Sequence, residues 1–130
     1  MDISDSLLKV YSSTALLGKV FYDQFFADCP EAIEYFDEVD MKRQAVVVTM
    51  ALTLVEQYQV SPFAPTKAYF EHLGVTHQRM GIPKQMYPHW VDSMLKALAK
   101  LHGDEWDDDL EIQWRKGFET AIGMMLESYQ

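Results

Sequence analysis

The chain has 130 residues, 48% of them hydrophobic, which suffices for one buried core and predicts a single domain over residues 1–130. Its 20 acidic and 11 basic side chains give a formal net charge of −9, which disfavours binding to nucleic acid or to an anionic membrane surface. The longest apolar run, Ala45 to Val55, is too short to cross a bilayer, which takes ~20 residues. One cysteine, Cys29, excludes an internal disulfide, and Asp2, Asp5 and Lys9 interrupt any signal peptide, so we expect a soluble, cytoplasmic protein.

The first third of the chain predicts two helices and a short third one. Apolar residues recur at helical spacing from Ile3 to Tyr11, with Asp2 or Ser4 as the cap. Pro30 suits the first turn of a short helix that ends in an acidic turn, because proline has no N–H to satisfy there. Between them, Ser12 and Ser13 can interrupt or cap, and a second helix follows up to Asp28; its apolar face consists of Leu16, Leu17, Val20, Phe21, Phe25 and Phe26.

A long helix is predicted from Met41 to about Tyr58, capped by Asp40. Its β-branched residues could indicate a strand, but the pattern continues without a turn signal well beyond the ~5–6 residues of a usual strand. Two prolines within Val60 to Pro65 predict a loop, and helical spacing resumes at Thr66. One face of the long helix carries Gln44, Val47, Val48, Ala51, Leu52 and Val55.

The next helix places His77 on its apolar face, because Phe70, Leu73 and His77 are separated by three or four residues. Gly81 can end this helix through a positive backbone φ. Pro88 then suits the first turn of a helix that Gly103 closes. The last helix starts among acidic residues, which the helix dipole favours, and carries apolar residues as far as Leu126.

No segment requires a strand, so the sequence predicts an all-α fold. About seven helices of unequal length, with prolines at two corners, are atypical of a regular four-helix bundle and indicate helices crossed at steeper angles. Such helices can enclose a pocket in which Tyr22, Gln44 and His77 meet. An iron porphyrin needs a neutral imidazole on one side, large apolar surfaces around its ring and few hydrogen-bond donors on the other side. The chain can meet all three needs. A core or capping histidine in an ordinary helical domain is the alternative.

Several motifs, in order along the chain, resemble bacterial single-domain globins and the globin module of flavohaemoglobins. The resemblance extends from about Leu7 to Leu126 and implies a globin fold, with about seven crossed helices around a haem b pocket. The motifs are Phe21-Tyr22-Asp23-Gln24-Phe25-Phe26, Cys29-Pro30-Glu31, Phe36, Leu73-Gly74-Val75-Thr76-His77, Gly81-Ile82-Pro83, Met86-Tyr87 and Trp114.

The resemblance also implies roles for individual residues. His77 matches the proximal iron ligand, Tyr22 the distal tyrosine, and Phe36 the phenylalanine that packs against the haem ring. Gln44 matches the distal glutamine, although a register shifted by one turn would put Met41 or Val48 in its place. Arg79 could reach a haem propionate, and the remaining haem contacts are expected from Val47, Val48, Phe70, Leu73 and Tyr87.

Tyr87 matches a proximal tyrosine that, in flavohaemoglobins, forms a hydrogen-bonded set with the histidine and a glutamate. Here Glu127 falls short of the place of that glutamate, so a backbone carbonyl is the alternative partner for His77. The resemblance therefore argues for haem binding more firmly than for catalysis.

Three hypotheses for function follow. The first is a haem globin that binds dioxygen and nitric oxide at a pentacoordinate or weakly hexacoordinate iron, with nitric oxide dioxygenase activity if a separate reductase returns the iron to the ferrous state. The second is a gas sensor or storage protein without catalysis. The third is a haem-free globin-like module that acts through a partner protein. A monomer and a homodimer are both compatible with the sequence.

Overall fold

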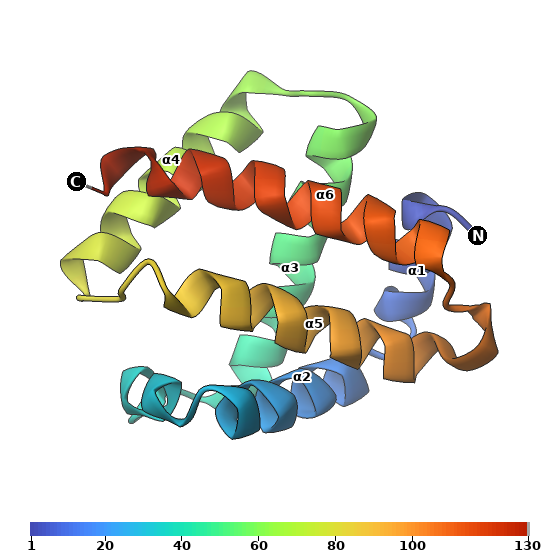
Figure 1. The fold of residues 1–130 in the computed structure, drawn as a ribbon, viewed down its shortest axis with the longest axis horizontal. Helices are drawn as coiled ribbons and strands as arrows, with labels where there is room; N and C mark the ends of the chain where they lie inside the picture. Colours follow the sequence, from blue (N-terminus) through green and yellow to red (C-terminus); the bar gives the residue numbers. More distant parts are fainter. Residues whose placement is uncertain (130) are drawn as a thin grey trace.

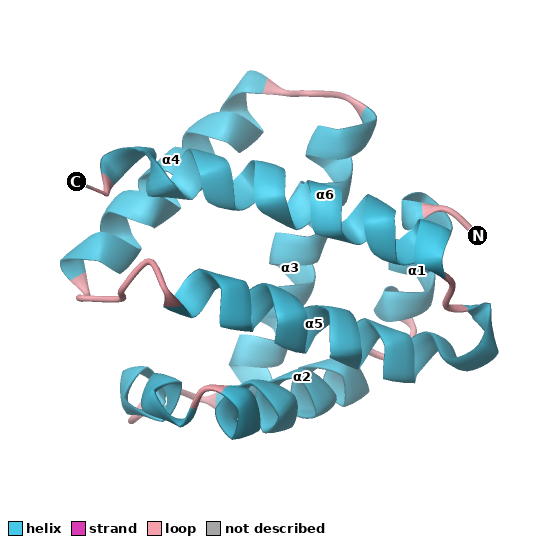
Figure 2. Ribbon diagram, viewed as in Figure 1, coloured by secondary structure: helices cyan, strands magenta, loops and turns pink. Residues whose placement is uncertain are grey.

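The computed structural model describes residues 1–129, and Figure 1 shows their arrangement. Within this range no strand occurs, and short loops join the helices, so the all-α prediction is confirmed (Figure 2). The six longer helices and the seven-residue η1 correspond to the seven that the sequence predicts. In chain order the elements are α1 (Ile3–Tyr11), α2 (Thr14–Asp28), η1 (Pro30–Phe36), α3 (Met41–Val60), α4 (Ala64–Arg79), α5 (Met86–His102), η2 (Gly103–Glu105), α6 (Asp108–Met125) and η3 (Leu126–Ser128).

The helices cross one another instead of running parallel as a bundle. In Figure 1, α5 lies beside α2 and α6, while α3 runs across them on the more distant side. α4 packs against α6 and η3 at the opposite end from α1. None of the helices in residues 1–129 is long and apolar enough to span a membrane.

Three of the predicted helix ends are confirmed, the starts of α1 and α3 and the end of α4. The carboxylate of Asp2 accepts from the backbone N–H of Asp5, and that of Asp40 accepts from the N–H of Lys42. Gly81 follows the end of α4 with a φ of 85°, as predicted for a residue that stops a helix.

The predicted loop from Val60 to Pro65 is too long. α3 continues through Val60, and α4 begins at Ala64, so only residues 61–63 lie outside the helices. Pro65 is in the first turn of α4, where its missing N–H costs no helical hydrogen bond, and the proline therefore starts a helix there. On α2, Leu16 is 54% exposed and does not belong to the buried face that Leu17 and Phe21 form.

Aromatic rings connect the three helices that form the main layer of the core. The ring of Trp90 on α5 lies 5.3 Å from that of Phe21 on α2 and 5.4 Å from that of Phe118 on α6, in edge-to-face geometry at both contacts. A buried polar group adds a second connection, because Trp114 donates to the hydroxyl of Ser6, which also bonds to His102. The ring contacts fix α2, α5 and α6 around one side of the cavity described below, and the contacts of Ser6 join α1 to α5 and α6.

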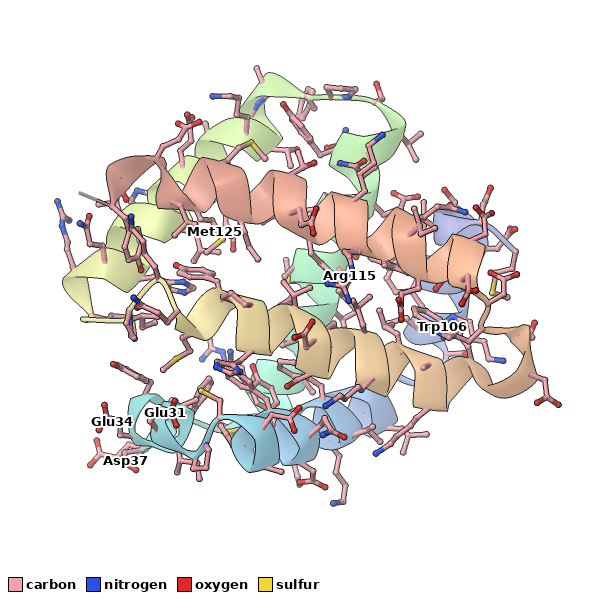
Figure 3. The ribbon with its side chains drawn as sticks, in the orientation of Figure 1. Glu31, Glu34, Asp37, Trp106, Arg115 and Met125 are labelled. Atoms are coloured by element: carbon pink, nitrogen blue, oxygen red, sulfur yellow. The ribbon has the colours of Figure 1, made fainter. Side chains whose placement is uncertain are left out.

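The excess of acidic side chains lies mainly on the outside. Figure 3 shows Glu31, Glu34 and Asp37 at η1, at the edge of the molecule, whereas Met125 lies on α6 further inward. All three acidic residues are exposed.

Asp28 joins the end of α2 to α5. Its carboxylate accepts from the hydroxyl of Ser93 at 2.9 Å and from the ammonium of Lys96 at 3.2 Å. The bond from Ser93 is the main reason that the pKa of Asp28 lies below its ordinary value, with smaller contributions from Lys96 and Gln24. The ionised form of Asp28 therefore stabilises the folded chain.

We expect Asp28→Asn to lower the free energy of unfolding at neutral pH by on the order of 1 kcal/mol, because bonds to a partly exposed charged group are lost. The stabilisation is present above the ordinary pKa of an aspartate and is lost as pH falls through the lowered folded-state pKa of Asp28. The gap between wild type and variant should therefore shrink in acid. Urea unfolding at several pH values measures it, with the exposed Asp23→Asn as control; a gap that widens in acid would contradict the assignment.

Candidate functional site

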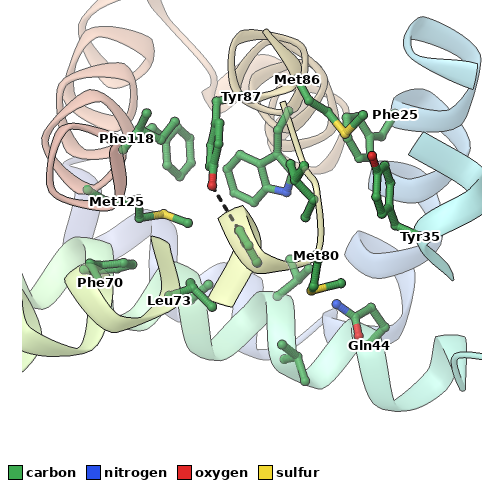
Figure 4. A pocket seen from close by; sticks show the side chains of 18 of the residues that line it. Phe25, Tyr35, Gln44, Phe70, Leu73, Met80, Met86, Tyr87, Phe118 and Met125 are labelled. Atoms are coloured by element: carbon green, nitrogen blue, oxygen red, sulfur yellow. Dashed lines mark hydrogen bonds between the residues drawn. The ribbon is translucent and has the colours of Figure 1, made fainter. Parts of the chain in front are cut away.

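A cavity of about 310 Å³ lies between α2, α3, α4, α5, α6 and η1. This volume is at the lower end of the ~300–1,000 Å³ typical of ligand pockets. Figure 4 shows Phe70 and Leu73 of α4 on one side and Phe25 and Tyr35 on the other, so the walls come from elements far apart in the sequence. The lining is mainly aromatic and aliphatic, with a few polar groups.

The structure brings together all but one of the residues that the sequence singled out for the pocket. Val47 is 44% exposed yet still lines the cavity. Arg79 is exposed and is not part of the lining, so its contact with a propionate stays a prediction. The lining includes Tyr22, Phe36, Gln44, Val47, Val48, Phe70, Leu73, His77 and Tyr87.

Tyr22 and Gln44 form the polar part of one wall. α2 and α3 approach closely at Gly18, where a Cβ would lie 2.4 Å from the Cβ of Ala45, and this crossing sets Tyr22, one turn on, near Gln44. Burial raises the pKa of Tyr22 to about 12, while an interaction with the Gln44 side chain acts in the opposite direction. Tyr22 therefore remains a neutral hydroxyl that can donate a hydrogen bond.

Phe36 holds Tyr22 in place. The two rings are 5.2 Å apart in edge-to-face geometry, and the ring of Phe26 lies 5.3 Å from that of Phe36. η1 thereby contributes to the cavity wall next to Tyr22. The ring contacts hold Tyr22 so that its hydroxyl can serve as an oriented donor group.

His77 provides a nitrogen on α4. Burial lowers its pKa, which favours the neutral imidazole. Its Nδ1 lies 3.2 Å from the hydroxyl of Tyr87, the contact drawn as a dashed line in Figure 4. Among the hydrogen bonds of residues 1–129 none involves Nε2, so this nitrogen is available to a ligand in the cavity.

The sequence analysis missed Tyr129, which continues the contacts of His77. The Tyr129 hydroxyl lies 3.1 Å from that of Tyr87 and donates to the carbonyl of Ile82 at 2.9 Å. Tyr129 follows the last predicted helix and belongs to no periodic pattern, and the family resemblance points to a carboxylate, not a tyrosine, as the partner of Tyr87. No local sequence signal therefore marks Tyr129.

The position of His77 depends on a close approach between α4 and α6. A Cβ at Gly74 would lie 1.9 Å from the carbonyl oxygen of Met125, so only glycine fits at this crossing. His77 is one turn further along α4, and η3, which leads to Tyr129, follows Met125 directly. The crossing therefore sets His77 and Tyr129 in register.

We expect Gly74→Ala to lower the free energy of unfolding by at least about 2 kcal/mol, since backbone atoms must move apart to admit the methyl group. Gly123→Ala is the matched control on α6, because its Cβ would meet nothing within 4 Å. The free energy of unfolding of Gly123→Ala should rise by about 0.5–1 kcal/mol, because alanine leaves the unfolded chain less conformational freedom than glycine does. Equal urea midpoints for the two variants would contradict the tight crossing.

The donor set fits an iron porphyrin better than a bare metal ion. In residues 1–129 no group of three His, Cys, Asp or Glu side chains could hold a metal. One neutral imidazole in an apolar cavity instead suits a metal that brings most of its own ligands on a large flat ring. His77 could bind the iron, and Phe36, Val48, Phe70 and Leu73 could contact the ring.

Comparison with known proteins agrees with this geometry. The globin family model matches residues 19–125, and the chain belongs to the globin family. It is 23% identical over 115 residues to a flavohemoprotein of Bacillus subtilis, a match that covers 85% of this chain and 29% of the relative. A flavohemoprotein of Halalkalibacterium halodurans is 22% identical over 115 residues, covering 85% of this chain and 27% of the relative. The chain thus spans less than a third of the length of these relatives.

Proposed function

We propose that this globin binds haem b in the cavity, with His77 as the axial ligand, and that it binds dioxygen and nitric oxide on the side of Tyr22 and Gln44. One observation carries the proposal: a neutral imidazole with a free Nε2 shares an apolar cavity with two polar side chains from other helices. The names of the flavohemoprotein relatives support the choice of haem.

His77 would hold the haem, which would supply an iron able to bind a diatomic gas. The residues of the chain then determine how long the gas stays. The Tyr22 hydroxyl and the Gln44 amide donate hydrogen bonds to the gas, each contributing on the order of 1–3 kcal/mol in a dry pocket. Val48, one turn beyond Gln44, also lines the cavity and would limit the space beside a bound gas. We expect these donors to slow release more than they affect association.

Two functions are compatible with tight gas binding. In the first, nitric oxide would react with dioxygen bound at the site to give nitrate, and a separate reductase would supply the electron that restores ferrous iron; similarity to flavohemoproteins supports it. In the second, the chain senses or stores a gas without turnover. The hydroxyl of Tyr129 beside Tyr87 favours the second, because a neutral partner makes the ligand less basic than a carboxylate would.

Titration of the purified chain with haem, followed by absorption spectroscopy, tests the proposal. We expect a strong Soret band that saturates at one haem per chain and shifts when carbon monoxide or nitric oxide is added to the reduced protein. If the chain folds but develops no such band, the proposal is refuted, and of the three hypotheses only the haem-free globin-like module remains. Consumption of nitric oxide in the presence of dioxygen and a reductase then separates catalysis from storage.

A further inference from the structure

Four groups lie in a row behind the cavity, and together they form a continuous hydrogen-bonded chain. The distances are 3.2 Å from His77 Nδ1 to Tyr87 Oη, 3.1 Å from Tyr87 Oη to Tyr129 Oη, and 2.9 Å from Tyr129 Oη to the carbonyl oxygen of Ile82. Three elements contribute to it, since His77 is on α4, Tyr87 on α5 and Tyr129 at the end of η3.

The end of this chain sets its direction. A carbonyl oxygen only accepts, so Tyr129 uses its single proton on Ile82. The oxygen of Tyr129 is then free to accept from Tyr87, and the oxygen of Tyr87 accepts from Nδ1 of His77. His77 therefore carries its proton on Nδ1 and presents the lone pair of Nε2 to the cavity.

No charged group takes part in this row of hydrogen bonds. Burial is the main cause of the strongly raised pKa of Tyr87, and its bond to Tyr129 adds to the effect, so Tyr87 stays neutral. Glu127, the carboxylate closest to Tyr129 in the sequence, acts elsewhere: the pKa of Lys67 on α4 is raised chiefly by Glu71, with a further contribution from Glu127. The acceptor behind His77 is thus a neutral hydroxyl.

Tyr129 also fixes the corner between α4 and α5. The N–H of Ile82 donates to the carbonyl of His77 at 3.1 Å, while the carbonyl of Ile82 accepts from Tyr129. One residue of the corner is therefore held both by the backbone of the histidine and by the last tyrosine. This double contact holds the carbonyl of Ile82, the last acceptor in the row of hydrogen bonds, in a fixed position.

We propose that Tyr129 is a positioning residue that, through Tyr87, holds the axial histidine in the Nδ1–H tautomer with a neutral acceptor. The inference rests on the proposed haem site for its electronic consequence, but the tautomer itself exists without haem. A neutral acceptor raises the basicity of a ligating imidazole less than a carboxylate does. The arrangement suits stable gas binding more than redox turnover.

The first test needs no haem. Long-range ¹H–¹⁵N NMR of the full chain at mildly alkaline pH reads the tautomer of His77. We expect Nδ1–H in the wild type. In Tyr129→Phe, Tyr87 loses its acceptor and can turn its own proton toward His77, so the Nε2–H population should rise. Wild-type His77 in the Nε2–H form, or an unchanged tautomer in Tyr129→Phe, would overturn the inference.

Tyr35→Phe is the matched control, because the Tyr35 hydroxyl donates to the carbonyl of Gly81 at 3.1 Å in the same corner but is not connected to Tyr87. In this variant, the tautomer of His77 should be the same as in the wild type. An equal change in both variants would show that tethering of the corner, and not the hydrogen-bonded chain, orients His77. A thermal melt of each variant confirms that it is folded before the spectra are compared.

The second test uses the haem-loaded ferrous protein. Resonance Raman spectroscopy should show the iron–histidine stretch at lower frequency in Tyr129→Phe and at higher frequency in Tyr129→Glu, which places a carboxylate beside Tyr87. Equal frequencies in all three proteins would contradict the electronic role. Failure to load haem would refute the proposed function, while the tautomer measurement would still decide the role of Tyr129.

Discussion

Replacement of His77 by alanine is expected to abolish haem retention. His77 offers the only imidazole among the described residues that line the cavity, and its Nε2 has no other partner among residues 1–129. Changes in the groups around a metal ligand typically cost 10–100-fold in affinity, so loss of the ligand itself should cost more than about 100-fold. Haem titration followed by gel filtration measures the effect, and the Soret band should not survive the column.

The control for this result is His72→Ala. His72 is exposed on the same helix and does not line the cavity, so its loss should leave haem affinity unchanged. Equal haem content in His77→Ala and the wild type would point to another ligand. Reduced haem content in both variants would indicate a general disturbance of α4 instead.

Tyr22→Phe is expected to accelerate dioxygen release by about 5- to 150-fold. This range corresponds to the loss of one hydrogen bond of ~1–3 kcal/mol in a dry pocket, at 1.4 kcal/mol per factor of ten. The ring of phenylalanine keeps the contacts with Phe21 and Phe36, so the cavity should retain its shape. Stopped-flow displacement of dioxygen by carbon monoxide gives the dissociation rate, and association should change much less.

Tyr69→Phe removes a hydroxyl from another part of the cavity lining and serves as the comparison. Its dissociation rate should match that of the wild type, because Tyr69 lies on α4, the helix of His77. Equal off-rates in Tyr22→Phe and the wild type would remove Tyr22 from the distal role and leave Gln44 as the donor.

Much of the fold could be predicted because helix caps, helix-ending glycines and apolar spacing are determined by residues close together in the sequence. Asp40 caps α3 and Gly81 follows α4 as their chemistry requires, and the apolar spacing from Phe70 to His77 directs that face of α4 into the cavity. The sequence predicts too long a loop before α4, because two prolines close together are typical of a loop, whereas Pro65 lies in the first turn of α4, where proline is compatible with a helix.

The candidate site was harder to predict where it depends on contacts between distant segments. Tyr129 reaches Tyr87 across 42 positions of sequence, and no local pattern encodes that meeting. The need for glycine at position 74 likewise comes from the carbonyl of Met125 on another helix. By contrast, Tyr22, Gln44 and His77 each lie on a helix face that periodicity or resemblance could indicate.

A crystal structure of the haem-reconstituted chain tests the central claim most directly. We predict that the iron is bonded to Nε2 of His77, that Nδ1 of the same ring lies within hydrogen-bond distance of Tyr87, and that Tyr22 and Gln44 face the other side of the haem. Iron bonded to a different side chain, or haem bound outside this cavity, would contradict the account.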